Sequence, residues 1–165
     1  MPGELGAFRA AFEVATAHTA AVIAATPDGL WDAPQPNGKL LRSELIHLSL
    51  VRESICRQLA QEPTAGAGSV FETEIWQRGT ADLGVAFHAH ADRCRALLAR
   101  MDETRLQSPF TTPFGNRSTP FNYLLVMLLE EQHHRAQMTM ALRLAGLEPP
   151  PYPGQAWVEL GVDQG

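Results

Sequence analysis

The stretch that decides the fold is residues 119–150, TPFNYLLVMLLEEQHHRAQMTMALRLAGLEPP. Thr119 suits the N-cap of a helix, and Pro120 suits the first helical position, where no backbone donor is needed. Gly146 suits the left-handed residue that follows a helix, and the prolines after it prevent continuation. These signals predict one helix over residues 120–145, about 39 Å long at 1.5 Å per residue. A helix of this length is typical of a helical bundle.

Three further helices are predicted from apolar residues that recur at helical spacing. They cover residues 4–25, 40–61 and 80–101. No segment alternates apolar and polar residues for long enough to indicate a sheet. The segment LQSPFTTPFGNRSTP, residues 106–120, favours a short hairpin or an extended crossover before the last helix. The sequence therefore predicts an all-α four-helix bundle with an irregular crossover.

The bulk composition is that of an ordinary globular protein. Its 165 residues suit a single domain, and 45% of them are hydrophobic. A formal charge of -5 and a single lysine argue against nucleic-acid binding, which needs clustered basic residues. The N-terminus has no secretory pattern and no apolar run approaches the roughly 18 residues of a membrane span, which favours a cytoplasmic location. Cys56 and Cys94 are expected to be buried as small hydrophobes.

Two segments are expected to form neither a helix nor a strand. The run EPTAGAGS, residues 62–69, has the composition of a flexible loop. The C-terminal tail is expected to be irregular, with Trp157 packing back on the bundle or on a second subunit.

The apolar side chains of the last helix are expected to gather on the side that carries Glu130, at about 100° per residue. They are Val126, Met127, Met138, Met140, Ala141, Leu144 and Ala145. Glu130 then lies near the middle of the buried stripe, with His134 and Gln137 within about 40° of it. Glu131, about 100° away, is expected to be solvated, and Arg135 lies on the polar face.

The same reasoning places His47 inside the apolar stripe of the second helix, with Ser49, Arg52 and Glu53 on its opposite, polar side. A buried ionised glutamate is costly unless it is paired, hydrogen-bonded or bound to a cation. Glu130 and His134 lie one turn apart on the same face, so their donor atoms can converge.

His47 can supply a third ligand from the neighbouring helix, as in other metal sites of helical bundles. Two histidines and a carboxylate suit Zn, Ni, Fe or Mn and leave coordination positions open. His133, Gln137 and Arg117 are expected to contact the ligands or a substrate, and His90 is a reserve ligand. A metal-free network of ion pairs and hydrogen bonds explains the same spacing equally well.

Two motifs carry a family resemblance. ELIHLSL, residues 44–50, and EEQHHRAQMTMALRLAGLEPP, residues 130–150, resemble the DinB/YfiT-like superfamily of four-helix bundles. The helix-two histidine of that family is a metal ligand, which corresponds to His47. The signature of its last helix is H-x-x-x-H-R-G-Q, whose second histidine corresponds to His134. This chain has Glu130 where the family usually has histidine, and Ala136 in place of the glycine.

The resemblance implies a bundle, commonly dimeric, that holds a divalent metal with three side chains. Some members are transferases that activate a low-molecular-weight thiol such as bacillithiol, mycothiol or glutathione. We therefore expect a thiol-dependent S-transferase, or a hydrolase that uses metal-activated water, acting on a small molecule as a homodimer, without nucleic-acid or membrane partners. Zn or Ni is expected first, with Fe or Mn as alternatives. The competing hypothesis is a non-catalytic, stress-related bundle that binds a metal or another ligand.

Overall fold

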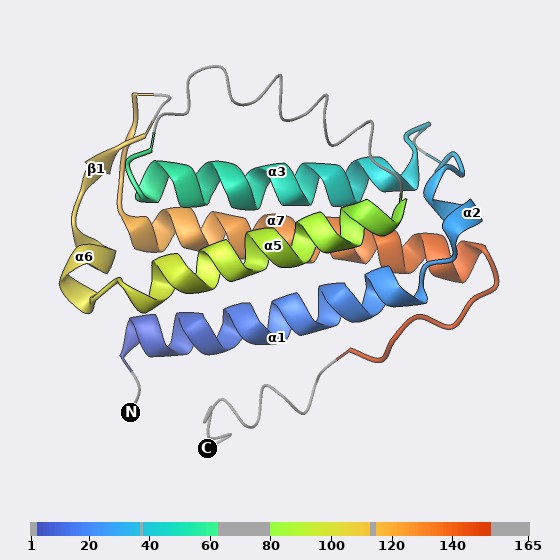
Figure 1. Ribbon diagram of the computed structural model, residues 1–165, viewed down its shortest axis with the longest axis horizontal. Coiled ribbons are helices and arrows are strands. Elements are labelled where there is room, and N and C mark those ends of the chain that lie inside the picture. Colours follow the sequence, from blue (N-terminus) through green and yellow to red (C-terminus); the bar gives the residue numbers. More distant parts are fainter. Residues whose placement is uncertain (1–2, 37, 63–79, 113–114, 153–165) are drawn as a thin grey trace.

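Four long helices form the bundle in the computed structural model, which describes residues 3–36, 38–62, 80–112 and 115–152 (Figure 1). These helices are α1 (Glu4–Ala25), α3 (Leu41–Leu59), α5 (Thr80–Ala99) and α7 (Pro120–Leu144). They confirm the predicted all-α bundle. Most of the loop at residues 62–69, together with Trp157, lies outside the described residues.

Short elements complete the connections between the long helices. They are α2 (Asp28–Trp31), α6 (Glu103–Gln107), β1 (Phe110–Thr111) and β2 (Arg117–Ser118). The two strands pair antiparallel, with Phe110 opposite Ser118, so the crossover contains the predicted hairpin. Neither short helix was predicted. For α6 the signal was present, because the Asp102 side chain caps it by accepting a hydrogen bond from the backbone amide of Arg105 at 2.7 Å.

Both ends of α7 have the predicted geometry. The Thr119 hydroxyl accepts a hydrogen bond from the backbone N–H of Asn122 at 3.3 Å. At the other end Gly146 has φ +75°, and the backbone N–H of Leu147 donates to the carbonyl oxygen of Leu142 at 2.9 Å. This pattern is a Schellman motif, which needs a left-handed residue and therefore favours glycine.

The core consists of two apolar clusters separated along the bundle axis. Phe12, Cys94 and Met127 belong to the first cluster, at the end of the bundle near α6. Trp31 and Phe87 belong to the second, near α2. On α1, α3 and α7, buried polar side chains lie between the two clusters in sequence. Five of them are joined by hydrogen bonds, and we call these the polar layer: Thr16, Thr19, Arg52, Glu131 and Arg135.

An ion pair lies at the centre of the polar layer. The guanidinium of Arg52 donates to the carboxylate of Glu131, and both side chains are fully buried. Arg52 also donates to the Thr16 hydroxyl at 2.9 Å, and the Thr19 hydroxyl donates to the Glu131 carboxylate at 2.7 Å. Such hydrogen bonds offset the cost of removing both charges from water.

Arg52 contacts every long helix of the bundle. Its guanidinium carbon lies 5.0 Å from the ring centroid of Phe12 on α1 and 4.4 Å from that of Phe87 on α5. It extends from α3 and pairs with Glu131 on α7. The aromatic faces supply cation–π attraction to a guanidinium whose Nε and Nη1 have no hydrogen-bond partner among the described residues.

The predicted rotation of α7 and of α3 about their axes was wrong. Glu131, expected in solvent, is fully buried, and Arg135 from the supposed polar face is only 5% exposed. On α3, Ser49, Arg52 and Glu53 are buried as well. Conversely, four apolar side chains expected in the core are exposed. They are Val126, Met140, Leu144 and Ala145.

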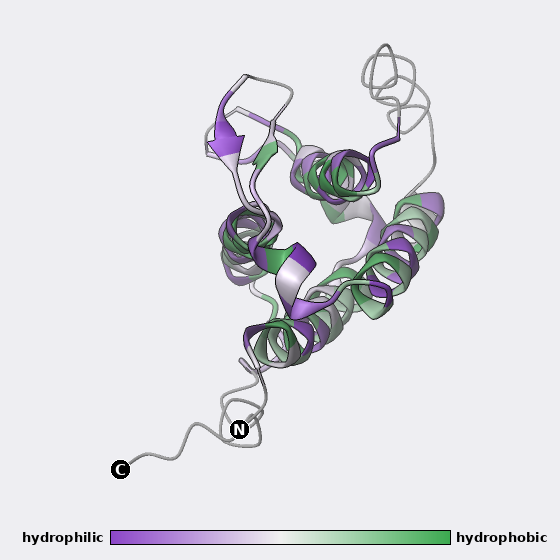
Figure 2. Cartoon of the chain, turned by 90° about the vertical axis from the view of Figure 1, so that its left-hand side faces the viewer, coloured by the Kyte–Doolittle hydropathy of each residue, from purple (hydrophilic) through white to green (hydrophobic). Residues whose placement is uncertain are grey.

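The physical reason is that α7 carries apolar residues on all sides while the centre of its buried face is charged. An apolar stripe computed from such a helix does not mark the buried face. Viewed from one end (Figure 2), the long helices surround a common axis, and each carries hydrophilic as well as hydrophobic residues.

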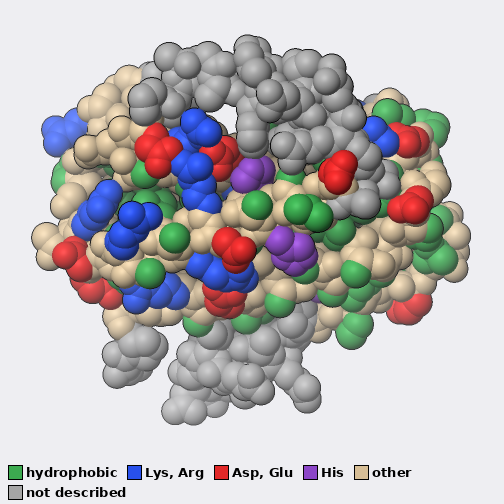
Figure 3. All heavy atoms as spheres, in the orientation of Figure 1, with side chains coloured by type: hydrophobic (Ala, Val, Ile, Leu, Met, Phe, Trp, Pro, Cys, Tyr) green, Lys and Arg blue, Asp and Glu red, His purple; other side chains and the backbone are tan. Residues whose placement is uncertain are grey.

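The surface charges are mixed. Acidic and basic side chains are interspersed on the face shown in Figure 3. Arg95, for example, pairs with Glu13 and Asp92. Within the described residues, every helix is too short or too polar to cross a membrane.

The two adjacent glutamates of α7 should differ sharply in their effect on stability. Replacing Glu131 with alanine leaves the Arg52 charge buried without its partner, so we expect the free energy of unfolding to fall by about 3–5 kcal/mol. Glu130→Ala, at the surface, should change it by about 0.5 kcal/mol or less. Urea unfolding of the metal-free proteins measures both. Equal losses in the two variants would contradict the assignment of Glu131 to the core.

Candidate metal centre

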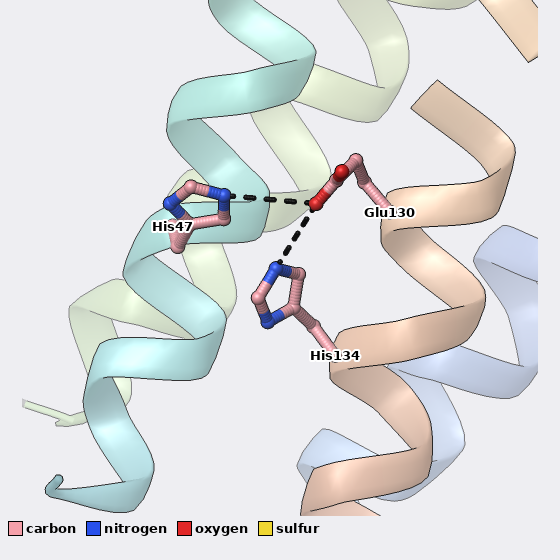
Figure 4. A group of neighbouring side chains, drawn as sticks. All are labelled: His47, Glu130 and His134. Carbon is pink, nitrogen blue, oxygen red and sulfur yellow. Dashed lines mark ion pairs between the residues drawn. The ribbon is translucent and has the colours of Figure 1, made fainter. Parts of the chain in front are cut away.

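The structure brings together the three predicted ligands. His47 extends from α3, and Glu130 and His134 extend from successive turns of α7 toward it (Figure 4). One donor atom from each lies within 4.8 Å of the others. The Glu130 carboxylate oxygen Oε2 lies 3.7 Å from His47 Nε2 and 3.3 Å from His134 Nε2.

These distances fit a shared cation. With bonds of about 2.0–2.1 Å, two ligand atoms on a tetrahedral zinc are about 3.3–3.4 Å apart. The separation between Glu130 and His134 agrees with this value, and that between Glu130 and His47 exceeds it by a few tenths of an ångström. The donor atoms of His47 and His134 lie within 4.8 Å of each other, so a side-chain adjustment would be needed to bring all three donors into range.

A buried carboxylate behind His134 fixes the orientation of its ring. Glu44 on α3 is 3% exposed, and its Oε2 lies 2.6 Å from His134 Nδ1. A proton must lie between these two atoms, because a carboxylate accepts hydrogen bonds. When that proton is on Nδ1 and the imidazole is neutral, Nε2 presents a lone pair toward Glu130. His134 Nε2 and the Glu130 carboxylate are then two hydrogen-bond acceptors that face each other, and a cation between them would bind both.

Gln137 and His133 extend this hydrogen-bonded arrangement. Hydrogen bonding orients the Gln137 amide so that its oxygen accepts from His133 Nε2 at 2.8 Å. Its nitrogen then donates to both oxygens of Glu44, at 2.5 and 2.9 Å. Glu44 is thus held from two sides, and it holds His134 in turn.

The centre lies at the surface between α3 and α7. The prediction that its ligands lie in the buried stripe was wrong for His47 and Glu130, whereas His134 is buried as predicted. The side chains of His47 and Glu130 are 54% and 40% exposed, whereas that of His134 is 11% exposed. They line an open cleft of ≈ 750 Å³ that also includes Lys39 and Ser43, and we call it the metal cleft. Glu130 is therefore not buried in the core, but the helical spacing correctly indicated that His47, Glu130 and His134 converge.

His47 is suited to donate a lone pair near neutral pH. Partial burial lowers the pKa of its imidazole below the ordinary value of 6.5, and the neighbouring His134 lowers it further. Glu130 and Glu44 oppose this shift. The net lowering favours the neutral ring, which is the form that binds metals.

Of the other predicted residues, His133 and Gln137 lie near the centre, whereas Arg117 and His90 do not. His133 lines the metal cleft, and Gln137 contacts Glu44 behind it. Arg117 lies in β2 and is exposed, ten or more residues before Glu130 and outside the cleft lining. His90, the reserve ligand, is buried on α5 and is not part of the group.

Sequence analysis missed Glu44. Its signal was the spacing Glu44-x-x-His47, because residues three apart lie on neighbouring turns of one helix side. Glutamate is common in the first turn of a helix, so the position of Glu44 alone does not indicate this contact.

Removing the Glu44 contact should weaken metal binding without removing a ligand. We expect Glu44→Ala to lower the affinity for Zn²⁺ by about 10–100-fold, because His134 loses the partner that orients it. Glu44→Gln retains an acceptor without the charge and should lie between the alanine variant and the wild type. Competition with a chelating dye measures all three proteins. Wild-type affinity in Glu44→Ala would contradict the positioning role.

The lowered pKa of His47 also predicts a pH dependence. Between pH 6.5 and the lower pKa of the folded state, the unfolded chain binds a proton at His47 that the folded chain does not. The free energy of unfolding therefore falls as pH falls through this window. In metal-free protein, urea unfolding between about pH 7.5 and about pH 5.5 should show a shallower decline for His47→Gln than for the wild type. A steeper decline in the variant would contradict the sign.

Comparison with known proteins identifies the family. The model described as DinB family matches residues 1–159, which is nearly the whole chain. No curated protein matches the sequence at a significant level. The match agrees with the helical bundle and with the two motifs on α3 and α7 that contribute His47, Glu130 and His134. The chain belongs to the DinB family.

Proposed function

We propose that the protein is a divalent-metal-dependent enzyme that acts on a small molecule with a thiol or water as nucleophile. The observation that carries this proposal is the convergence of His47, Glu130 and His134 in an open cleft, with Glu44 fixing one of the rings. A purely structural metal site is normally closed by four protein ligands. Here three side chains converge and the cleft leaves room for further ligands.

Each residue has a distinct task in this proposal. His47, Glu130 and His134 would hold the cation, and Glu44 keeps His134 in the tautomer whose Nε2 can donate a lone pair. A bound divalent cation would lower the pKa of a thiol or water and so supply a nucleophile near neutral pH. Lys39 adds a cationic side chain to the lining of the same cleft, which suits a substrate with an anionic group.

The ligand set influences the choice of metal. Two neutral histidines and one carboxylate leave a divalent cation with one net positive charge, one unit less than three histidines would. The carboxylate oxygen also shifts the preference toward harder metals, although histidine nitrogen still suits Zn and Ni. We therefore propose Zn or Ni, with Fe or Mn as alternatives.

Metal analysis tests the site itself. Protein purified without chelator should carry about one divalent metal per chain, and adding Zn²⁺, Ni²⁺ or Mn²⁺ to stripped protein should raise its melting temperature. Glu130→Ala should abolish both effects. Glu148→Ala, an exposed glutamate beyond α7, serves as the matched control and should retain them.

The contrary result has a clear meaning. If stripped protein neither binds these ions nor changes its melting temperature, the proposed metal site is wrong. The polar group would then be a metal-free network, and the competing proposal of a non-catalytic bundle would be favoured.

Activity distinguishes the two chemistries. Metal-loaded protein should convert an electrophilic acceptor together with a low-molecular-weight thiol such as bacillithiol, mycothiol or glutathione, and Glu130→Ala should lose this turnover. Mass spectrometry of the products separates thiol transfer from hydrolysis. Conversion of acceptor at the same rate with and without thiol would establish a hydrolase and contradict the transferase.

A further inference from the structure

A second cleft adjoins the metal cleft and has a different character. It has a volume of ≈ 540 Å³, and its walls come from the segment before α3, from the start of α3 and from the C-terminal half of α7. Its apolar lining consists of Pro36, Leu41, Ala136, Met140 and Leu144. We call it the apolar cleft. Glu44 and His133 line both clefts, so the two share a wall.

The polar side chains in the apolar cleft hydrogen-bond mainly to one another. Glu44 accepts from Gln137 and contacts His134, while the Gln137 oxygen accepts from His133. These contacts occupy the amide of Gln137 and both carboxylate oxygens of Glu44. The wall between the clefts therefore offers a ligand few free polar atoms, and burial of apolar groups dominates binding beside it.

The floor and the rim differ in exposure. Leu41 is fully buried at the floor, whereas Met140 and Leu144 at the rim are 60% and 64% exposed. A ligand that fills the cleft would cover both rim side chains. Methionine is well suited to such a role, because its flexible thioether adapts to apolar groups of different shape.

We propose that the apolar cleft binds the alkyl, acyl or aryl part of a small amphipathic substrate whose polar head lies at the metal centre. This inference rests on the proposed function, because it takes the metal cleft as the position of the head group. The shared wall carries the argument, since a head group in the metal cleft and a chain in the apolar cleft are neighbours along Glu44 and His133. The substrate class is therefore a small molecule with a polar, metal-binding end and an apolar chain.

A series of straight-chain hydroxamates tests this arrangement, because the hydroxamate head chelates metals while the chain length varies. Acetohydroxamate, butanohydroxamate, hexanohydroxamate and octanohydroxamate are titrated into Zn²⁺-loaded protein by isothermal calorimetry. We expect the affinity to rise by about four-fold for each added methylene until the cleft is filled. Metal-free protein should bind none of the series with comparable affinity.

Charged substitutions at the rim locate the chain. Met140→Glu and Leu144→Glu should each remove most of the gain with chain length while leaving the affinity for acetohydroxamate unchanged. Leu129→Glu is the matched control, because Leu129 is 61% exposed on the same helix but does not line the apolar cleft. It should retain the full gain.

The outcomes separate this inference from the function on which it rests. Binding of acetohydroxamate without any gain for longer chains would overturn the inference and leave the metal centre intact. If the affinity of both Met140→Glu and Leu144→Glu still rises with chain length as it does in the wild type, the inference is also wrong. Failure to bind any of Zn²⁺, Ni²⁺, Fe²⁺ and Mn²⁺ would overturn both proposals. If sedimentation shows a dimer that Met140→Glu and Leu129→Glu both dissociate, a second copy of the chain covers this face and the inference is wrong.

Discussion

The buried ion pair between Arg52 and Glu131 sets how α3 and α7 are rotated about their axes. Rotating α7 by one residue, about 100°, would place Glu130 opposite Arg52 and remove His134 from Glu44. Thr19 opposes that alternative because its hydroxyl donates to Glu131. A pair of charges in an apolar core is weak evidence for stability, but it can select one arrangement among several of similar packing. In this protein the selected arrangement is the one that brings the candidate ligands together.

The limits of prediction from this sequence have a physical explanation. The ends of α7 were predicted correctly because Thr119 and Gly146 act through local backbone geometry. The buried face of α7 was predicted wrongly because its centre is Glu131. The partner of Glu131 is Arg52, which lies on α3, 79 residues earlier in the sequence. No local pattern contains that partner. The hydrophobic pattern instead pointed to residues such as Met140 that the structure exposes.

The candidate site shows a second kind of limit. His47, Glu130 and His134 could be named because a turn of helix separates two of them and a family motif contains the third. Glu44 could not be named from burial, since its partners Gln137 and His134 belong to α7. The residues that hold the ligands in place are determined by contacts between helices, whereas the ligands themselves can be predicted partly from spacing along one helix.

Glu130 and Glu131 are adjacent in sequence, yet one faces the cleft and the other the core. The demands of folding and of chemistry therefore act on different residues within a single turn. Glu130 makes no contact with the ion pair between Arg52 and Glu131, so replacing Glu130 with histidine would leave that pair in place. The ligands in the cleft can therefore be altered independently of the charges that fix the rotation of α7.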